Sequence, residues 1–201
     1  MKRLASTLPN MMLSLVIVTA LSGALLGGMY ALTKKPIEEA RQNAVVSAIA
    51  KVAPEFDNDP VKDAVDVEIA GNRFTIYPTL KEDKLTGAAV EGRSMNGFAG
   101  EIVVMCGFTA DGTVKDYQVI QQGETPGLGT RMQEWFRDPA GARSVLGRNP
   151  GRDSFYVTKD KEHHGSVDAI TAATISSRAF LETMRNAYEA YKDYSLKSSE
   201  R

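Results

Sequence analysis

Cysteine, histidine and tryptophan are scarce in this sequence, which contains one cysteine, two histidines and one tryptophan. A single thiol, Cys106, excludes a disulfide framework within the chain and a cysteine-rich metal or iron–sulfur site. The two histidines, His163 and His164, are adjacent and follow a run of charged residues, which indicates a solvated loop. The sequence therefore predicts no metal site, and no residue is predicted to be catalytic.

The chain also lacks an excess of charge and the common nucleotide-binding motifs. Its 24 basic and 25 acidic residues give a net charge of −1, and no basic cluster is present. This balance offers no footprint for a nucleic acid. No strand–GxGxxG–helix unit and no GxxxxGK[ST] motif occurs, so a Rossmann or P-loop nucleotide site is not expected.

A long uncharged segment near the N-terminus decides the class of protein. Residues 4–33 carry no charge, and Met11 to Leu32 are mostly Leu, Val, Ala, Met and Gly. At about 1.5 Å per residue this stretch is long enough to span a hydrocarbon core of about 30 Å. The alternative is a cleaved signal peptide, but Met29-Tyr30-Ala31 matches a cleavage site poorly. We therefore expect an uncleaved membrane anchor.

The flanks of this segment bear on orientation and partners. Lys2 and Arg3 precede it while Lys34 and Lys35 follow it, so charge favours a cytoplasmic N-terminus only slightly. Within it, the Gly23–Gly27 repeat places small residues one turn apart. This pattern allows another helix to approach closely, although glycine is also frequent in membrane helices generally.

The residues after the anchor read as a stalk followed by a folded domain. Apolar residues recur at three- and four-residue spacing between Pro36 and Pro54, which predicts an amphipathic helix. A polar linker from Asp57 to Asp63 follows. We therefore divide the chain into an anchor (1–35), a stalk helix with linker (36–60) and one larger domain (61–201).

Strand patterns begin this larger domain, and a helix ends it. Two hairpins are predicted, one around the turn at 71–72 and one around the turn at 111–112. A short helix at 132–136, a further strand at 155–157 and a long C-terminal helix with an apolar face at 180–191 complete the pattern. The fold class is α+β, a mainly antiparallel sheet with packed helices. Cys106, Trp135 and Phe136 are expected in its core, although Trp135 or Phe136 could instead stack on a planar ligand.

Two stretches could carry chemistry. The loop Gln122–Gly129 contains glycines that allow a close approach to a ligand, but surface turns often look alike. In the stretch Asp168–Phe180, the hydroxyl of Thr174 or Ser176 could cap the last helix. The same helix N-terminus would equally favour a phosphate ester on Thr174.

The run D-A-I-T-A-A-T-I-S-S, which begins at Asp168, resembles the flavinylation signature D-x-x-[ST]-G-A-T-x-[ST]-S of the FMN-binding domain family. The resemblance implies that FMN is bound through a phosphoester to Thr174, installed by a separate flavin transferase that uses FAD. It also implies that the transferase recognises Asp168 and Thr171. Thr171, Ala172 and Ala173 would lie at the cofactor, and Ala172 departs from the glycine usual in the signature.

Two further stretches support the same resemblance. The loop E-T-P-G-L-G, Glu124 to Gly129, matches the family's second signature, which implies that Glu124, Thr125, Gly127 and Leu128 bind the cofactor. The stretch G-F-A-G-E-I, residues 97–102, resembles the motif at which one of the family's strands begins. Residues 61–201 are thereby identified as a covalent FMN-binding domain.

With its single anchor, the whole chain is similar to the family of G subunits of the Rnf (or Rsx) electron-transport complexes. This similarity implies an electron carrier in a redox-driven ion translocase, without substrate turnover of its own. Its partners would be other membrane and redox subunits, and its location the bacterial cytoplasmic (inner) membrane with the flavin domain on the periplasmic or outer side. The alternatives are the C subunit of the sodium-pumping NADH:quinone reductase and a cofactor-free single-pass binding protein.

Overall fold

The computed structural model of the chain describes residues 7–69 and 71–199. Its first element is α1, Leu8–Val52, a single helix with Pro36 inside it. The stretch expected to span the membrane and the helix expected between Pro36 and Pro54 are therefore parts of one continuous helix. A proline removes one N–H from the helical ladder, but its fixed φ is close to the helical value, so the helix can continue past it. Lys2 and Arg3, used above to predict orientation, lie outside the described residues.

The chain divides into two compact units, Met1–Asn43 and Ala44–Arg201. In the first unit, α1 exposes nearly all of its side chains. By length and composition, α1 is the one helix among the described residues that could cross a membrane. This agrees with the predicted anchor.

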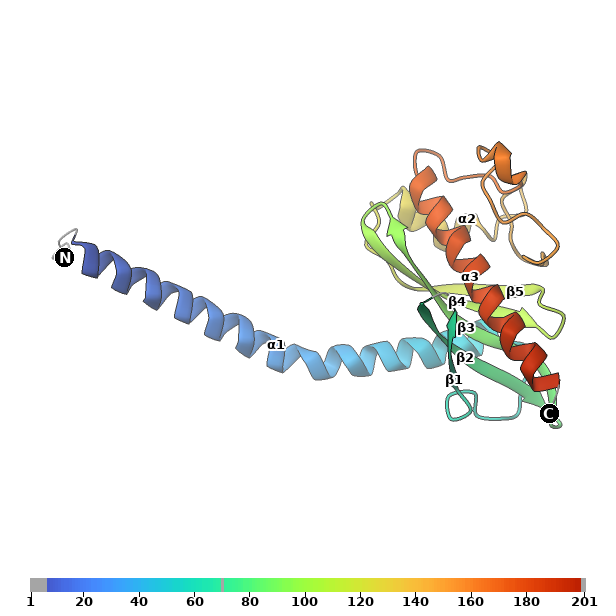
Figure 1. Cartoon of the computed structure of the whole chain (residues 1–201), viewed down its shortest axis with the longest axis horizontal. Helices are drawn as coiled ribbons and strands as arrows, with labels where there is room; N and C mark the ends of the chain where they lie inside the picture. The colour runs from blue at the N-terminus through green and yellow to red at the C-terminus, as the bar shows by residue number, and fades with distance from the viewer. Residues whose placement is uncertain (1–6, 70, 200–201) are drawn as a thin grey trace. The chain divides into compact units, whose positions relative to one another are not determined.

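The second unit is built on a five-stranded antiparallel sheet with the strand order β1-β2-β3-β4-β5 (Figure 1). The strands are β1 Val65–Ile69, β2 Asn72–Lys81, β3 Lys84–Gly97, β4 Gly100–Thr109 and β5 Val114–Gln121. Each strand pairs with the next along the chain, so the sheet is a simple meander. The two predicted hairpins, β1–β2 and β4–β5, are confirmed.

The longest strand, β3, was not predicted from the sequence. Its buried stretch includes Gly87, Ala88, Ala89 and Gly92, which are small residues without the alternation of polar and apolar types that marks a half-buried strand. The strand is central and covered on both faces, which removes the need for alternation. Gly97 and Gly100 pair across the tip of the β3–β4 hairpin, so the stretch 97–102 contains a turn as well as the start of β4.

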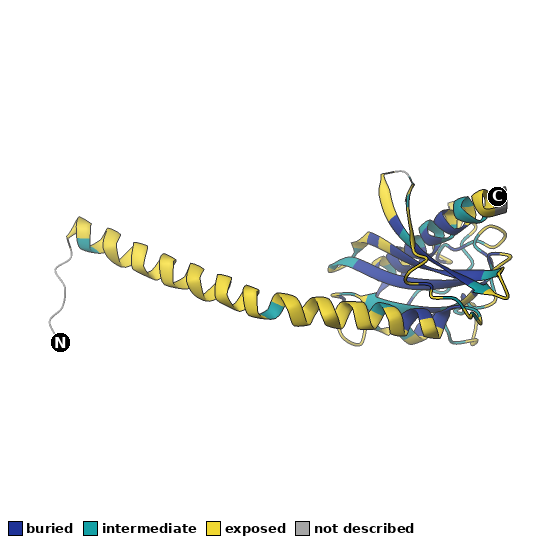
Figure 2. Ribbon diagram, turned by 90° about the horizontal axis from the view of Figure 1, so that it is seen from below, coloured by how far each residue is buried: buried dark blue, intermediate teal, exposed yellow. Residues whose placement is uncertain are grey.

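Two hydrophobic clusters lie on opposite faces of the sheet. Ala88 and Val90 of β3 pack with the C-terminal helix α3, Thr174–Ser199, whereas Ala89 packs with the last turns of α1. Figure 2 shows buried stretches, in dark blue, along the strands of the sheet. The end of α1 contributes Ala48, Ile49 and Val52 to its cluster, so these residues belong to the folded domain.

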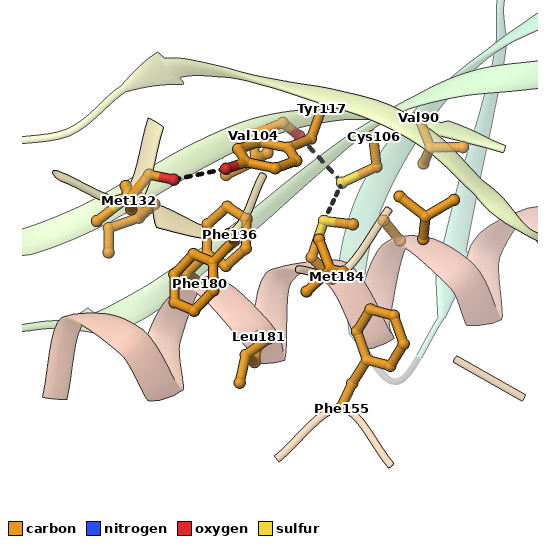
Figure 3. Close-up of a cluster of buried hydrophobic side chains, with 14 of the residues drawn as sticks. Val90, Val104, Cys106, Tyr117, Met132, Phe136, Phe155, Phe180, Leu181 and Met184 are labelled. Atoms are coloured by element: carbon orange, nitrogen blue, oxygen red, sulfur yellow. Dashed lines mark hydrogen bonds between the residues drawn. The ribbon is translucent and has the colours of Figure 1, made fainter. Parts of the chain in front are cut away.

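The larger cluster confirms the predicted core positions. Cys106 is fully buried, and its Sγ lies 3.1 Å from Sδ of Met184 on α3 (Figure 3). Phe136, just after the short helix α2 (Met132–Trp135), stacks on Phe180 of α3 with ring centroids 4.4 Å apart. Trp135 is also buried, and the guanidinium of Arg143 lies 4.2 Å from its ring centroid.

The predicted strand at 155–157 is wrong. Phe155 and Val157 are buried, but Val157 forms only an isolated parallel bridge with Val167. The chain turns directly afterwards, because the N–H of Asp160 donates to the carbonyl of Val157 at 2.8 Å. A short 3₁₀ helix, Lys161–His163, follows, and both histidines are exposed as expected.

Candidate functional site

Asp168 holds the loop that leads into α3. Its N–H donates to the carbonyl of Ala142 at 2.7 Å, and its Oδ2 accepts from the N–H of Ala142 at 3.2 Å. Its carbonyl accepts from Nε1 of Trp135 at 2.8 Å. Asp168 is therefore engaged with the neighbouring loop and with α2, which sets the starting position of the segment 169–173.

Ser177 fixes the other end of the same segment. Its buried hydroxyl accepts a hydrogen bond from the N–H of Ile170 at 3.0 Å and donates one to the carbonyl of Ala173 at 2.9 Å. The loop is thereby folded back on the first turn of α3. Ser177 stands at the last position of the signature, and these two hydrogen bonds are a physical reason for a serine there.

Ala172 adopts a left-handed backbone conformation, with φ of 61°. A side chain with a Cβ is strained there, whereas glycine is not. The structure thus explains why glycine is usual at this position of the signature. The exposed methyl group of Ala172 does not displace the loop, since the hydrogen bonds of Asp168 and Ser177 that hold its two ends are formed.

Thr174 is the first residue of α3, and its side chain is partly exposed. Ala173 precedes the helix, so neither Thr174 nor Ser176 occupies the N-cap position considered above. The Oγ1 of Thr174 accepts a hydrogen bond from Nζ of Lys159 at 3.4 Å. A helix N-terminus and a lysine together favour a negatively charged group on this hydroxyl.

Lys159 was missed as a site residue. The sequence places it in a charged run that reads as solvated loop, and it is indeed exposed. Only the turn after Val157 brings it to the start of α3, and no spacing along the chain indicates this. Its ammonium group donates to the hydroxyl of Thr174, so it belongs to the surroundings of that residue.

Glu124 joins the second signature to the first. Its Oε2 accepts a hydrogen bond from Oγ of Ser176 at 2.5 Å, and its Oε1 accepts from the N–H of Ala99 at 3.1 Å. Only 4% of Glu124 is exposed, and a buried carboxylate needs such donors. One side chain thus connects the E-T-P-G-L-G loop, α3 and the tip of the β3–β4 hairpin.

The glycine that ends the second signature is required by this close packing. A Cβ on Gly129 would lie 2.7 Å from both Oε2 of Glu124 and Oγ of Ser176. The loop is closed by hydrogen bonds from the N–H of Leu128 to the carbonyl of Thr125, at 3.1 Å, and from the N–H of Gly127 to Oγ1 of Thr130, at 3.0 Å. Thr125, Gly127 and Leu128 are exposed.

The two signatures meet around a cavity of about 400 Å³. Six of the predicted site residues line it: Glu124, Thr125, Leu128, Ala172, Ala173 and Thr174. Thr171, Gly127 and Asp168 lie outside this lining. Phe98, Gly129, Ile175 and Ser176 line it as well and were not among the predicted site residues.

A second cavity of about 430 Å³ shares Ile175 with the first but has a different character. Its charged lining includes Arg178 and Asp160, which form an ion pair at 2.5 Å. The hydrogen bond from Arg178 lowers the pKa of the Asp160 carboxyl below its ordinary value. These charges are paired with each other, and Thr174 does not line this cavity.

Comparison with known proteins places the chain in a family. The FMN-binding domain family matches residues 97–189, which include the hairpin tip, both signatures and most of α3. The G subunit of the ion-translocating oxidoreductase complex of Erwinia tasmaniensis is 32% identical over 184 residues, covering 86% of this chain and 84% of the relative.

Two other relatives match over nearly their whole length. The protein of the same name from Aliivibrio fischeri (strain ATCC 700601 / ES114) is 29% identical over 199 residues, covering 94% of this chain and 92% of the relative. The G subunit of the Na(+)-translocating ferredoxin:NAD(+) oxidoreductase complex of Acetobacterium woodii is 26% identical over 194 residues, covering 91% of each. The chain thus belongs to the family of G subunits of the ion-translocating oxidoreductase complexes and contains an FMN-binding domain.

Proposed function

We propose that this chain is a membrane-anchored electron carrier whose FMN is bound covalently, through its phosphate, to the hydroxyl oxygen of Thr174. The observation that carries the proposal is the meeting of the two signatures at one cavity whose lining includes Thr174. The FMN would supply the redox chemistry, while the protein holds and orients it.

The residues present fit FMN in two respects. Its phosphate would lie at the N-terminus of α3, near the ammonium group of Lys159, where negative charge is favoured. The cavity beside it has the volume typical of small-ligand sites and is lined in part by apolar side chains such as Leu128 and Ile175. The Glu124 carboxylate, which also lines the cavity, already accepts hydrogen bonds from Ser176 and Ala99.

Attachment exchanges one group on Thr174 for another. The threonine oxygen loses its proton and gains the FMN phosphoryl group, and with FAD as donor the second product is AMP. We propose that a separate flavin transferase performs this step and that Asp168 and Thr171 form part of what it recognises. Thr171 is exposed, which is consistent with contact by a second protein.

The anchor and the named relatives support a place in a complex. We propose that other membrane and redox subunits donate and accept the electrons, that the chain turns over no substrate alone, and that the complex moves ions. The helix α1 would run through the anchor (1–35) and into the stalk helix with linker (36–60), and the FMN-binding domain (61–201) would follow. The relatives named above are all G subunits, which favours this assignment over the C subunit of the quinone reductase.

We further propose that the domain after Lys34 lies on the periplasmic or outer side of the cytoplasmic membrane. A reporter fused after Arg201 that is active only in the cytoplasm should then stay silent, while one that is active only outside should give a signal. The reverse pattern would contradict this orientation.

Substitution of Thr174 tests covalent attachment. The Thr174→Ala protein, coexpressed with a flavin transferase, should lose flavin fluorescence after denaturation. Its mass should fall by one FMN less one water, beyond the substitution itself. The fold should survive, because replacing a partly exposed side chain usually changes the stability by less than about 0.5 kcal/mol.

Thr171→Ala is the matched control. It removes a hydroxyl from the same signature but leaves the acceptor oxygen in place, so covalent flavin should still form, at most more slowly. Covalent flavin that persists on the Thr174→Ala protein would overturn the proposal.

A further inference from the structure

Three exposed apolar side chains converge on the cavity lined by Thr174. Phe98 is 68% exposed, Ile175 50% and Leu128 38%, and all three line this cavity. They come from three separate segments: the tip of the β3–β4 hairpin, the first turn of α3 and the E-T-P-G-L-G loop. Exposed apolar side chains gathered around one cavity indicate a binding site for an apolar surface.

The backbone that presents Phe98 is held in place. The N–H of the next residue, Ala99, donates to the buried carboxylate of Glu124 at 3.1 Å. A Cβ on the preceding residue, Gly97, would lie 2.7 Å from the same carboxylate and 2.3 Å from the carbonyl of Gly100. The hairpin tip is therefore packed against the second signature, and the position of Phe98 follows from that packing.

Among the described residues that line the cavity, Phe98 is the aromatic one. Trp135, the other aromatic considered from the sequence, has its indole N–H bonded to Asp168 and the guanidinium of Arg143 over its ring. Aromatic rings attract one another by stacking and by edge-to-face contact, beyond the area that they bury. The isoalloxazine ring of FMN is a large planar surface of this kind.

We propose that Phe98 contacts the isoalloxazine ring of the FMN and that Leu128 and Ile175 cover the ring around it. This inference rests on the proposed function, because FMN attached at Thr174 brings the ring to this cavity. It assigns the hairpin tip a role in shielding and orienting the flavin. Phe98 would accordingly be a cofactor-contacting residue that neither signature contains.

Shielding can be measured as the access of iodide to the flavin in the native protein. The full chain and its variants are produced with a flavin transferase, and the mass of each confirms that covalent FMN is present. Iodide quenching of flavin fluorescence and the circular dichroism of the visible flavin bands are then recorded. In Phe98→Ala we expect quenching to approach that of free FMN and the dichroism to weaken, whereas Phe98→Tyr should stay close to the wild type.

Met95→Ala is the matched control. Met95 lies on the same hairpin, three residues before Phe98, and is 69% exposed, but it does not line the cavity. Its replacement should leave both measurements unchanged. The inference is overturned if Phe98→Ala behaves as the wild type does, or if the wild-type flavin is already as accessible to iodide as free FMN.

The mass measurement separates this inference from the proposal on which it rests. Wild-type protein without covalent flavin would contradict attachment at Thr174, and the ring contact would then be tested by titration with free FMN. Phe98→Ala should in that case bind roughly tenfold more weakly, the loss that about 1.4 kcal/mol of stacking would give. Equal affinities of the two proteins for FMN would overturn the ring contact.

Discussion

Replacing Ala172 by glycine should stabilise the folded domain. Ala172 has a φ of 61°, and a left-handed conformation costs a residue with a Cβ roughly 1–2 kcal/mol. Glycine avoids that cost, but it loses more conformational freedom on folding, which lowers the free energy of unfolding by roughly 0.5–1 kcal/mol. The free energy of unfolding should therefore rise by about 0.5–1 kcal/mol in Ala172→Gly.

Thermal unfolding of the full chain in detergent measures this change. For a domain of this size, about 1 kcal/mol corresponds to a shift in Tm of roughly 2–4 °C, so we expect an increase of about 1–4 °C. Covalent flavin should form on the variant at least as fully as on the wild type, because glycine is usual at this position of the signature.

Ala173→Gly is the control for this prediction. Ala173 is buried and is not among the residues with positive φ, so glycine should there lower the Tm by removing a packed methyl group and adding chain entropy. A rise in Tm for Ala172→Gly together with a fall for Ala173→Gly would distinguish relief of backbone strain from a general effect of glycine. A lower Tm for Ala172→Gly would refute the reasoning.

Three other predictions concern the surroundings of the site. Lys159→Met should slow the formation of covalent flavin, measured by mass over time, because the ammonium group favours a phosphate at the helix start; Lys161→Met, an exposed lysine nearby, should not. Glu124→Ala should lower the free energy of unfolding in urea by about 2–3 kcal/mol, since two donors lose a buried carboxylate, and Glu124→Gln should cost less; equal costs would contradict a role for the charge. Asp160, whose pKa is lowered below 3.8 by the hydrogen bond from Arg178, should stabilise the fold at pH values above 3.8. The free energy of unfolding in urea should exceed that of Asp160→Asn, and the excess should shrink as the pH falls through the lowered pKa. An excess that stays constant with pH would contradict this.

The parts of the fold that the sequence predicts are those with a regular local pattern. Strands β1, β2, β4 and β5 show alternation or turn residues, and α3 shows an apolar face, so each could be recognised. The strand β3 could not, because small residues covered on both sides leave no alternation to read. Phe155 and Val157 mimic a strand because alternate residues are buried there, yet the chain turns after them.

The candidate site divides in a similar way. The signatures indicate Thr174 and Glu124 directly, since both belong to short contiguous motifs. Lys159 and Phe98 reach the site only through the turn after Val157 and the packing of the hairpin tip, which are tertiary features. The left-handed backbone conformation of Ala172, which explains why glycine is usual at this position of the signature, is likewise seen only in the three-dimensional structure.

The buried position of Cys106 has a consequence for a protein that handles electrons. Flavins that react with oxygen release peroxide, which attacks thiolates and converts them to sulfenic and higher acids. Burial raises the pKa of the Cys106 thiol and keeps it protonated, and Met184 beside it is buried as well. The only thiol of the chain is thus buried and protonated. Peroxide released by the flavin should therefore leave Cys106 unoxidised.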